Sequence, residues 1–484
     1  MKWVLVTVMS LAFAGPALAQ ATRAGGQGQV VKLTVRPAAA PSPALKYTLL
    51  PAFLDRVDGD AAKVYLLAIM TYRQIEGQTD FARGDANSDA IRDYLDLPIA
   101  ALPREKVAAI MARYADVIQQ LEIAGRMNQC RWDLPFGEQG VNAALNGPVN
   151  QARSLVYLLA LRARLQIAEK KYDQAIRTIQ TALALSRNLN NQAVLIQELV
   201  SVACSTLTLN QVSELIQQPD APNLYWALAS LPRPFIDPAS TVDWEGNIML
   251  VGFPALMEAA RDPMDAGRWQ KVWEEARTAT AALYENPTSA KNPTAASVSA
   301  LLTATAARDY TTAKKYLIST GIPAEQVEKM PVAQVAGMYF LHMGRTATDD
   351  YWKWWALPFW QADEGFARSS MQAAERKKRD PGNMMAMMAE VAAPGMMRAR
   401  FNLAAVDRQI AALQCVEALR AYAAGHDGKL PASLDELVDT PAPIDPVTGK
   451  PFIYRVEGKT AVLESPAPKS DPRPASALRY EITM

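Results

Sequence analysis

Aromatic rings next to carboxylates form the group of residues in this sequence that is best suited to chemistry. Residues 351–360, YWKWWALPFW, hold the densest aromatic cluster of the chain, with the indoles of Trp352, Trp354, Trp355 and Trp360. Such rings stack on sugars or peptides when they are exposed and fill a core when they are buried. Polysaccharide binding or polysaccharide chemistry on this cluster is therefore one hypothesis for the protein, with a packed core as its structural alternative.

Four carboxylates flank these tryptophans: Asp349, Asp350, Asp363 and Glu364. Two carboxylates about 5 to 10 Å apart can carry acid and base chemistry on a glycosidic bond. Neighbours along a helix point in different directions, however, so adjacency in the sequence does not establish such a pair. A charged rim around an aromatic core is the structural alternative.

A calcium-loop pattern is present but incomplete. Residues with oxygen ligands occupy positions 1, 3, 5, 9 and 12 of a loop: Asp85, Asn87, Asp89, Asp93 and Asp96. The sharp turn at position 6 needs glycine, where this sequence has alanine, and position 12 needs a bidentate glutamate. The chain also lacks the His-Glu-x-x-His, Gly-x-Ser-x-Gly, Walker and Cys-x-x-Cys motifs. We therefore assign no catalytic, cofactor-binding or metal-binding residue and expect no cofactor.

The three cysteines cannot all pair within one chain. Cys204 and Cys415 lie in apolar helical stretches, where an unpaired cysteine acts as a small buried hydrophobe. Cys130 lies in a loop-like stretch, so one disulfide from Cys130 stays open as an alternative to three unpaired thiols. A nucleophilic cysteine needs a base nearby, and the only histidines are His342 and His426.

Charge and length limit the class of protein. The chain has 484 residues, enough for about two or three domains. Its 50 lysines and arginines nearly cancel its 49 aspartates and glutamates. Nucleic-acid binding usually needs a basic face, so we expect no nucleic-acid partner.

The first twenty residues, MKWVLVTVMSLAFAGPALAQ, have the pattern of a secretory signal peptide (1–19). Lys2 supplies the positive start, an apolar stretch follows, and small residues end at a cleavage site near Ala19. No later stretch reaches the ~20 apolar residues of a membrane-spanning helix. We expect an exported protein, periplasmic or extracellular, that is soluble or loosely associated with the envelope. Retention of the signal as an anchor stays open.

The rest of the chain divides into four predicted parts. Residues 20–44 are rich in Gly, Ala and Pro and are predicted to be a flexible linker. Residues 45–218 are predicted to be the first half of a helical array, and a proline-rich corner opens its second half, 219–395. Residues 396–484 are predicted to be a small α+β module. The expected fold class is mainly α, an irregular tetratricopeptide-like array with this module at its end.

The helical hairpin over residues 152–189 carries the tetratricopeptide-like signal. Small Ala175 and Ala182 let the paired helix approach closely, and Tyr172 fills the turn. A solenoid needs about three repeats, and only one good copy exists, so the array is predicted to be irregular. The side chains predicted to contact a partner are Tyr157, Arg164, Tyr172 and Arg177.

Residues 396–484 are predicted to form a helix followed by turns and strands. An apolar stripe marks a helix over residues 402–424, and Ser433 with Glu436 forms a capping box. Asp445 with Pro446 favours a turn before an alternating strand that contains Tyr454. A hairpin alone is marginal in water, so it must pack on the preceding helix, and residues 478–484 can add a third strand.

Two resemblances follow from these residues. Residues 418–456, ALRAYAAGHDGKLPASLDELVDTPAPIDPVTGKPFIYRV, resemble the helix-and-turn part of type II secretion pseudopilins and type IV pilins. The long apolar helix with which pilins begin has no counterpart before this segment, and the calcium-binding tail of major pseudopilins is not matched. Residues 47–69, 95–114 and 130–137, the hairpin and the C-terminal module together resemble an uncharacterised family of exported helical proteins from planctomycete-type bacteria. That resemblance implies architecture and location but no activity.

Two functions are therefore carried forward. The first is a non-enzymatic scaffold of the cell envelope that offers a helical groove to a protein partner. The second is a protein that binds or acts on a glycan through the tryptophan cluster. Absence of catalytic motifs and the neutral charge favour the first.

Overall fold

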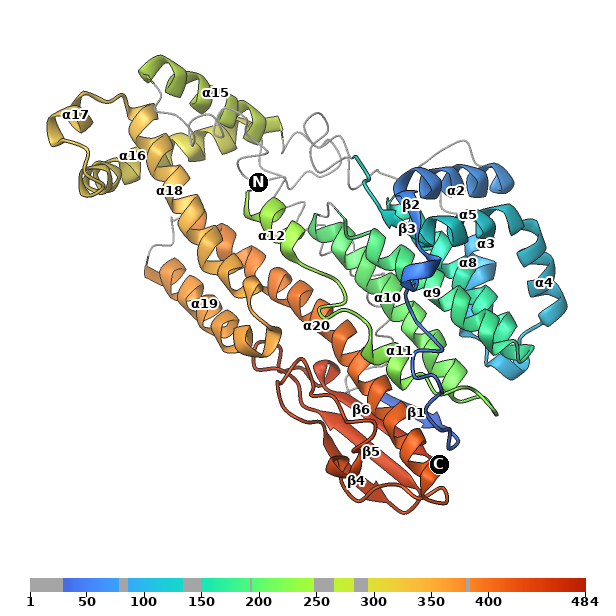
Figure 1. The fold of residues 1–484 in the computed structure, drawn as a ribbon. Coiled ribbons are helices and arrows are strands. Elements are labelled where there is room, and N and C mark those ends of the chain that lie inside the picture. Colours follow the sequence, from blue (N-terminus) through green and yellow to red (C-terminus); the bar gives the residue numbers. More distant parts are fainter. Residues whose placement is uncertain are drawn as a thin grey trace.

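The computed structural model describes residues 29–77, 86–133, 149–191, 194–247, 265–282, 295–379 and 384–484. The predicted signal peptide lies outside these residues. Helices dominate the described chain, and a small sheet lies at one end of the molecule (Figure 1). The predicted fold class, mainly α with a small α+β module, is confirmed.

Four long helices form the centre: α8 (Val149–Ala168), α9 (Tyr172–Asn188), α10 (Leu195–Ile216) and α20 (Met384–Gly425). The first two are the predicted hairpin, which turns at Lys170 with a left-handed φ of 59°. Within the described residues, α10 alone is long and apolar enough to cross a membrane. It packs against α8, α9 and α20 with most of its surface buried, as a core helix does.

A first lobe covers one side of this centre (Figure 1). Its elements are η1 (Phe53–Asp55), β2 (Val57–Asp60), α2 (Ala61–Glu76), α3 (Ala86–Asp96), η2 (Ile99–Ala101), α4 (Arg104–Arg113), α5 (Ala115–Gly125) and β3 (Met127–Gln129). Strands β2 and β3 pair in parallel, and the helices that flank them, α2 and α5, pack together. Tyr65, Val107 and Leu121 are fully buried, which anchors the lobe in the main core.

The proline-rich corner contains α11 (Tyr225–Ala229), which packs on α20, and leads to α12 (Ala239–Gly246), which packs on α18 and α10. A second lobe follows, with α15 (Ala266–Ala282), α16 (Ala295–Ser319), α17 (Ala324–Lys329) and α18 (Val332–Trp352). It has a small core of its own around Leu317 and Val335. Helix α18 continues through η3 (Lys353–Ala356) to α19 (Phe359–Arg379), which packs on α20.

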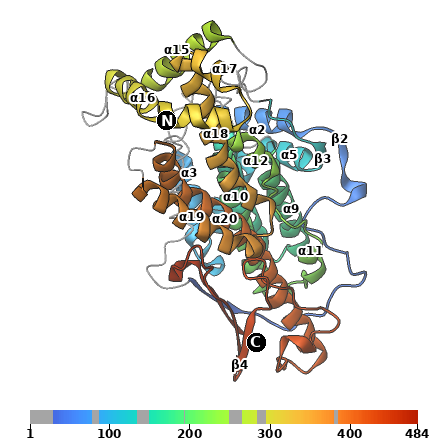
Figure 2. The ribbon, with the colours of Figure 1, turned by 90° about the vertical axis from the view of Figure 1, so that its left-hand side faces the viewer.

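Helix α20 connects the two ends of the molecule. It has 42 residues, which at ~1.5 Å per residue gives a length of about 60 Å. One end meets α18 and α19, and the other passes over the sheet (Figures 1 and 2). The predicted boundary between residues 395 and 396 therefore falls inside one continuous helix.

The sheet has four strands in the order β1–β6–β5–β4. These are β1 (Gln29–Thr34), β4 (Ile453–Glu457), β5 (Thr460–Ser465) and β6 (Leu478–Thr483). The three C-terminal strands are antiparallel, and β1 adds to β6 in parallel. Residues 434–436 form a 3-10 turn, η4 (Leu434–Glu436), closed by the predicted capping box. A second 3-10 turn, η5 (Pro474–Ser476), precedes β6.

Strand β1 differs from the prediction of a flexible linker over residues 20–44, of which residues 20–28 lie outside the described residues. Leu33 pairs with Ile482 and is buried, and Val35 just beyond the strand is 1% exposed. The composition of the segment is dominated by Gly, Ala and Pro, which hid a six-residue strand with a period of two. The N-terminal strand therefore belongs to the same module as the C-terminal residues.

Candidate functional site

The predicted tryptophan platform is divided between core and surface. Trp352 and Trp355 are buried, with ring centroids 4.8 Å apart. Trp354 is half-buried, and its Nε1 donates to Ser369 Oγ at 2.9 Å. Trp360 is 43% exposed. In this conformation only Trp354 and Trp360 retain surface for a ligand, and stacking on these rings stays a prediction.

Two of the four carboxylates near the tryptophans hold the C-terminal module. Asp363 accepts the backbone N–H groups of Lys469 and Ser470 at 2.8 and 2.9 Å, and Glu364 pairs with the Lys469 ammonium at 2.5 Å. Asp350 accepts from Lys353 Nζ at 2.9 Å. These contacts fit the structural interpretation, in which charged residues frame an aromatic core.

The hairpin side chains predicted to contact a partner mostly contact this chain. Tyr157 and Arg164 are buried, and the Arg164 guanidinium donates to the Leu97 carbonyl oxygen. The Tyr172 hydroxyl donates to the Pro219 carbonyl oxygen at 2.7 Å. Arg177 is exposed. Partner contact through these four residues stays a prediction, and three of them stabilise the fold.

The thiols are buried and unpaired: Cys130, Cys204 and Cys415. Burial raises the pKa of Cys130 and of Cys204 to about 12, so these thiols stay protonated at neutral pH. In the calcium-like stretch, Asp85 lies outside the described residues, and 86–96 form α3 without the turn that such a loop needs. Among the described residues, no group of three or more His, Cys, Asp or Glu is arranged to hold a metal.

A buried charged junction, which the sequence did not predict, joins the first turn of α10 to α12 and α20. Glu245 of α12 is 6% exposed and accepts the Leu195 backbone N–H at 2.9 Å. Glu198 of α10 is fully buried, and burial raises its pKa to about 8. The charge of Arg400 and the nearby Thr241 hydroxyl oppose this rise of the pKa. Neither carboxyl oxygen of Glu198, however, has a hydrogen bond of normal geometry to a described residue.

The α20 side of this junction carries Arg400 and Asp407. Arg400 Nη2 donates to the Leu357 carbonyl oxygen at 2.9 Å, and burial lowers the pKa of the guanidinium. Asp407 accepts the Phe235 backbone N–H at 2.8 Å, and burial raises its pKa to about 6. Titratable groups with pKa values shifted by burial mark candidate functional sites, which makes the junction the leading candidate in the described interior.

The sequence contained a weak signal for this junction. Glu198 lies among Leu195, Leu199 and Val202, all of them buried, and so occupies a position where a helix facing the core usually has an apolar residue. Its partners on α12 and α20 come from distant parts of the chain. Periodicity can therefore flag the glutamate but cannot identify what it meets.

A second buried charged site, farther along α20, is completely hydrogen-bonded. Arg420 pairs with Glu417 at 2.7 Å and also donates to the carbonyl oxygens of Arg36 and Ala221, both at 2.9 Å. Glu417 additionally accepts the Leu224 backbone N–H at 3.0 Å. This site fastens the N-terminal segment and the proline-rich corner to α20.

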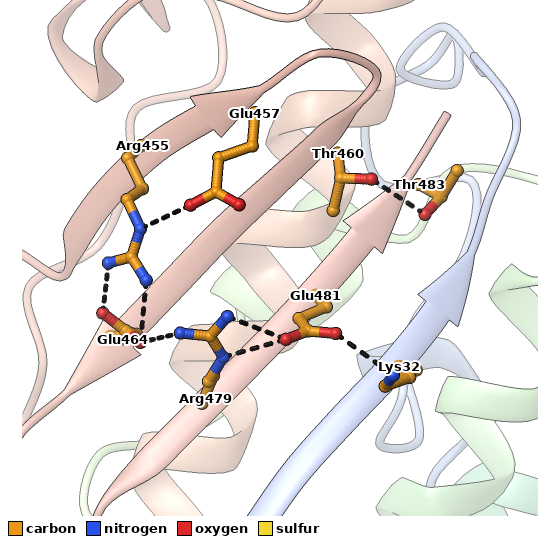
Figure 3. A network of polar contacts seen from close by, with 8 residues as sticks. All are labelled: Lys32, Arg455, Glu457, Thr460, Glu464, Arg479, Glu481 and Thr483. Carbon is orange, nitrogen blue, oxygen red and sulfur yellow. Dashed lines mark hydrogen bonds and ion pairs between the residues drawn. The ribbon is translucent and has the colours of Figure 1, made fainter.

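The outer face of the sheet carries a ladder of ion pairs with alternating charge (Figure 3). The ladder runs across all four strands in the order Lys32, Glu481, Arg479, Glu464, Arg455 and Glu457. Arg455 and Glu464 approach to 2.5 Å, and Lys32 and Glu481 to 3.5 Å. Opposite residues of neighbouring strands share a face, so the register of the sheet aligns these charges. Three cations balance three anions, which gives this face no net charge.

Comparison of the chain with protein-family models, with curated proteins and with solved structures gives no match. Function is therefore argued from this chain alone.

Proposed function

We propose that this protein is an exported helical scaffold of the cell envelope that binds a protein partner through apolar side chains of residues 53–70. The exposed side chains are Phe53, Leu54, Val57, Leu67 and Met70. Two large apolar residues in succession, Phe53 at 82% and Leu54 at 92% exposure, carry the proposal. Apolar side chains that cluster on a surface are typical of sites that bind another protein.

The turn that presents this pair is fixed by hydrogen bonds. The Asp55 N–H donates to the Ala52 carbonyl oxygen at 3.0 Å, and Arg56 Nε donates to the Pro51 carbonyl oxygen at 3.2 Å. A turn held in this way loses little conformational entropy when a partner binds. Aromatic and aliphatic side chains on a rigid support are suited to act as the anchors of an interface.

Helix α2 carries further exposed apolar side chains. Leu67 and Met70 lie three residues apart and therefore share one face of the helix, which is exposed. Thr71 of α2 contacts Gln120 of α5, and one turn farther along α5 lies Ile123, which is also exposed. An apolar segment of a partner protein is the ligand that this chemistry favours.

The test uses the mature chain from Gln20 onward, cross-linked in an envelope extract of its own cell and read by mass spectrometry. We expect one recurrent protein partner, which is then purified and titrated. The variant Phe53→Ser with Leu54→Ser should weaken that binding at least about tenfold, because an anchor residue contributes ~2 kcal/mol or more.

The matched control is Val438→Ser, which removes an apolar side chain that is 78% exposed in the C-terminal module. It should bind the partner as the unmodified chain does. Equal binding by the double variant and the unmodified chain would contradict the proposed surface. Recovery of glycan without a protein partner would contradict the scaffold function.

A further inference from the structure

We propose that the junction of α10, α12 and α20 is a proton-operated latch, in which one proton on the Glu198 carboxyl keeps α12 docked. This inference goes beyond the binding function above and does not depend on it. It rests on the contacts that fix α12, on the charges that face Glu198 and on the position of α12 between the central helices and the second lobe.

Two side chains of α12 meet the first turn of α10. Thr241 and Glu245 are four residues apart and therefore share one face of the short helix. Glu245 accepts the N–H of Leu195, the first residue of α10, and Thr241 lies next to Glu198. The docking of α12 therefore places the Glu245 carboxylate close to the Glu198 carboxyl.

The charges that face Glu198 do not favour its ionised form. Among the described residues, the charges that act on it are those of Arg400 of α20, Glu245 of α12 and Asp237 of the corner. Farther out, Arg187 faces Asp237 and Arg56, and Asp407 faces Arg400 and Arg233. Next to Glu198 there are therefore one cation and two carboxylates. An ionised Glu198 adds a third negative charge in a buried site, where a charge without a full set of hydrogen bonds is costly.

Release of α12 relieves this cost because water can then reach the Glu198 carboxylate. The movement would be transmitted to the second lobe, since α12 packs on α18 as well as on α10. A Cβ atom on Gly246, at the end of α12, would lie 3.8 Å from the indole of Trp352 at the end of α18. The latch therefore lies where the main core supports the second lobe.

The sign of the pH dependence follows from the two states. The pKa of Glu198 is about 8 when α12 is docked and returns towards its ordinary value of 4.5 when water reaches the carboxyl. Opening then releases a proton between these values. The opening equilibrium constant should rise about tenfold per pH unit between about pH 5 and pH 8 and level off above it.

Hydrogen exchange of residues 239–247 in the full chain, corrected for the intrinsic pH dependence of amide exchange, measures this opening. Protection in the unmodified protein should fall about tenfold per unit up to pH 8. Glu198→Gln, which is uncharged at every pH, should give protection that does not change with pH. The control Asp243→Asn, on the exposed face of α12, should follow the unmodified protein. A flat profile in the unmodified protein, or an unchanged slope in Glu198→Gln, would overturn the proposal.

A second measurement needs no variant. Infrared spectroscopy of the unmodified protein at pH 7 should show a carbonyl band of a protonated carboxylic acid that disappears with a midpoint near pH 8. Burial also raises the pKa of Glu417, so the midpoint identifies the band of Glu198. Asp407, with a pKa of about 6, is largely ionised at pH 7 and does not mask it. Absence of that band at pH 7 would overturn the latch even where Glu198→Gln fails to fold.

Discussion

Helix α20 takes part in two buried charged sites that differ in how completely they are hydrogen-bonded. At one site, Arg420 and Glu417 form an ion pair, and backbone groups complete the hydrogen bonding of both. At the junction of α10, α12 and α20, Arg400 faces Glu198, but the oxygens of Glu198 have no hydrogen bond of normal geometry among the described residues. The two sites share one helix and the same residue types.

Burial raises the pKa of Glu417 as it does that of Glu198, and at both glutamates an arginine charge and a neighbouring donor oppose the shift. The two sites differ in hydrogen bonding. Glu417 accepts from Arg420 at 2.7 Å and from the Leu224 N–H at 3.0 Å, whereas neither oxygen of Glu198 has such a bond among the described residues. A site with all its hydrogen bonds made resists change and holds chain segments together. A site with few hydrogen bonds responds to pH instead.

The largest effect is expected from Arg420→Met, which removes the cation of the fully bonded site. Glu417 would stay buried without its partner, and three backbone carbonyl oxygens would lose their donor. Breaking a buried ion pair in this way costs about 3–5 kcal/mol of unfolding free energy. Urea unfolding at pH 7 measures it, and a loss below ~1 kcal/mol would remove the distinction between the two sites.

The next effect is the pH dependence of stability that Glu198 causes. Its pKa is higher in the folded chain than in the unfolded chain, so the folded chain holds an extra proton between the two values. The unfolding free energy should therefore fall by about 1.4 kcal/mol per unit from about pH 5 to pH 8. Urea unfolding across this range should give that slope for the unmodified chain but not for Glu198→Gln. An equal slope in both chains would locate the titrating group elsewhere.

A smaller effect of the same sign is expected from Asp407. Burial raises its pKa from 3.8 to about 6, so stability should fall by about 1.4 kcal/mol per unit over roughly pH 4 to 6. Asp407→Asn should lack this part of the pH profile and keep the part between pH 6 and 8. Thermal unfolding at closely spaced pH values separates the two windows. Loss of both windows in this variant would mean that Asp407 and Glu198 titrate as one unit.

The smallest effect is expected from Arg455→Met on the outer face of the sheet, which is the matched control for Arg420→Met. Arg455 pairs with Glu464 and Glu457, but its side chain is 42% exposed and water screens its charge. The melting temperature should change little, and the change should shrink further at high salt. A loss of stability as large as that caused by Arg420→Met would show that burial does not determine how much each arginine contributes to stability.

Much of the fold could be predicted because its signals are local. The α8–α9 hairpin follows from small and apolar residues at spacings of three and four, and the 3-10 turn after Ser433 follows from the capping box. The turn before β4 forms around Asp445, whose carboxylate accepts the Val447 N–H and the Ser465 hydroxyl. Each of these features depends on residues close together in the sequence, or on a turn whose chemistry they set.

The candidate site could not be predicted, because its partners meet only in the folded chain. The sequence pattern predicted a ligand-stacking site at the tryptophans, but Trp352 and Trp355 are buried in the core. The junction around Glu198 draws its charges from four separate elements, and no spacing rule connects them.

The sequence by itself determined the helical class, the hairpin and the form of the C-terminal module, since periodicity and turn residues act over a few positions. Tertiary structure alone decided that β1 completes the C-terminal sheet and that Arg420 contacts the carbonyl of Arg36, which is 384 positions away. It also decided which charged groups are removed from water. Such contacts depend on which surfaces the whole core brings together, and their energies exist only once water has been excluded.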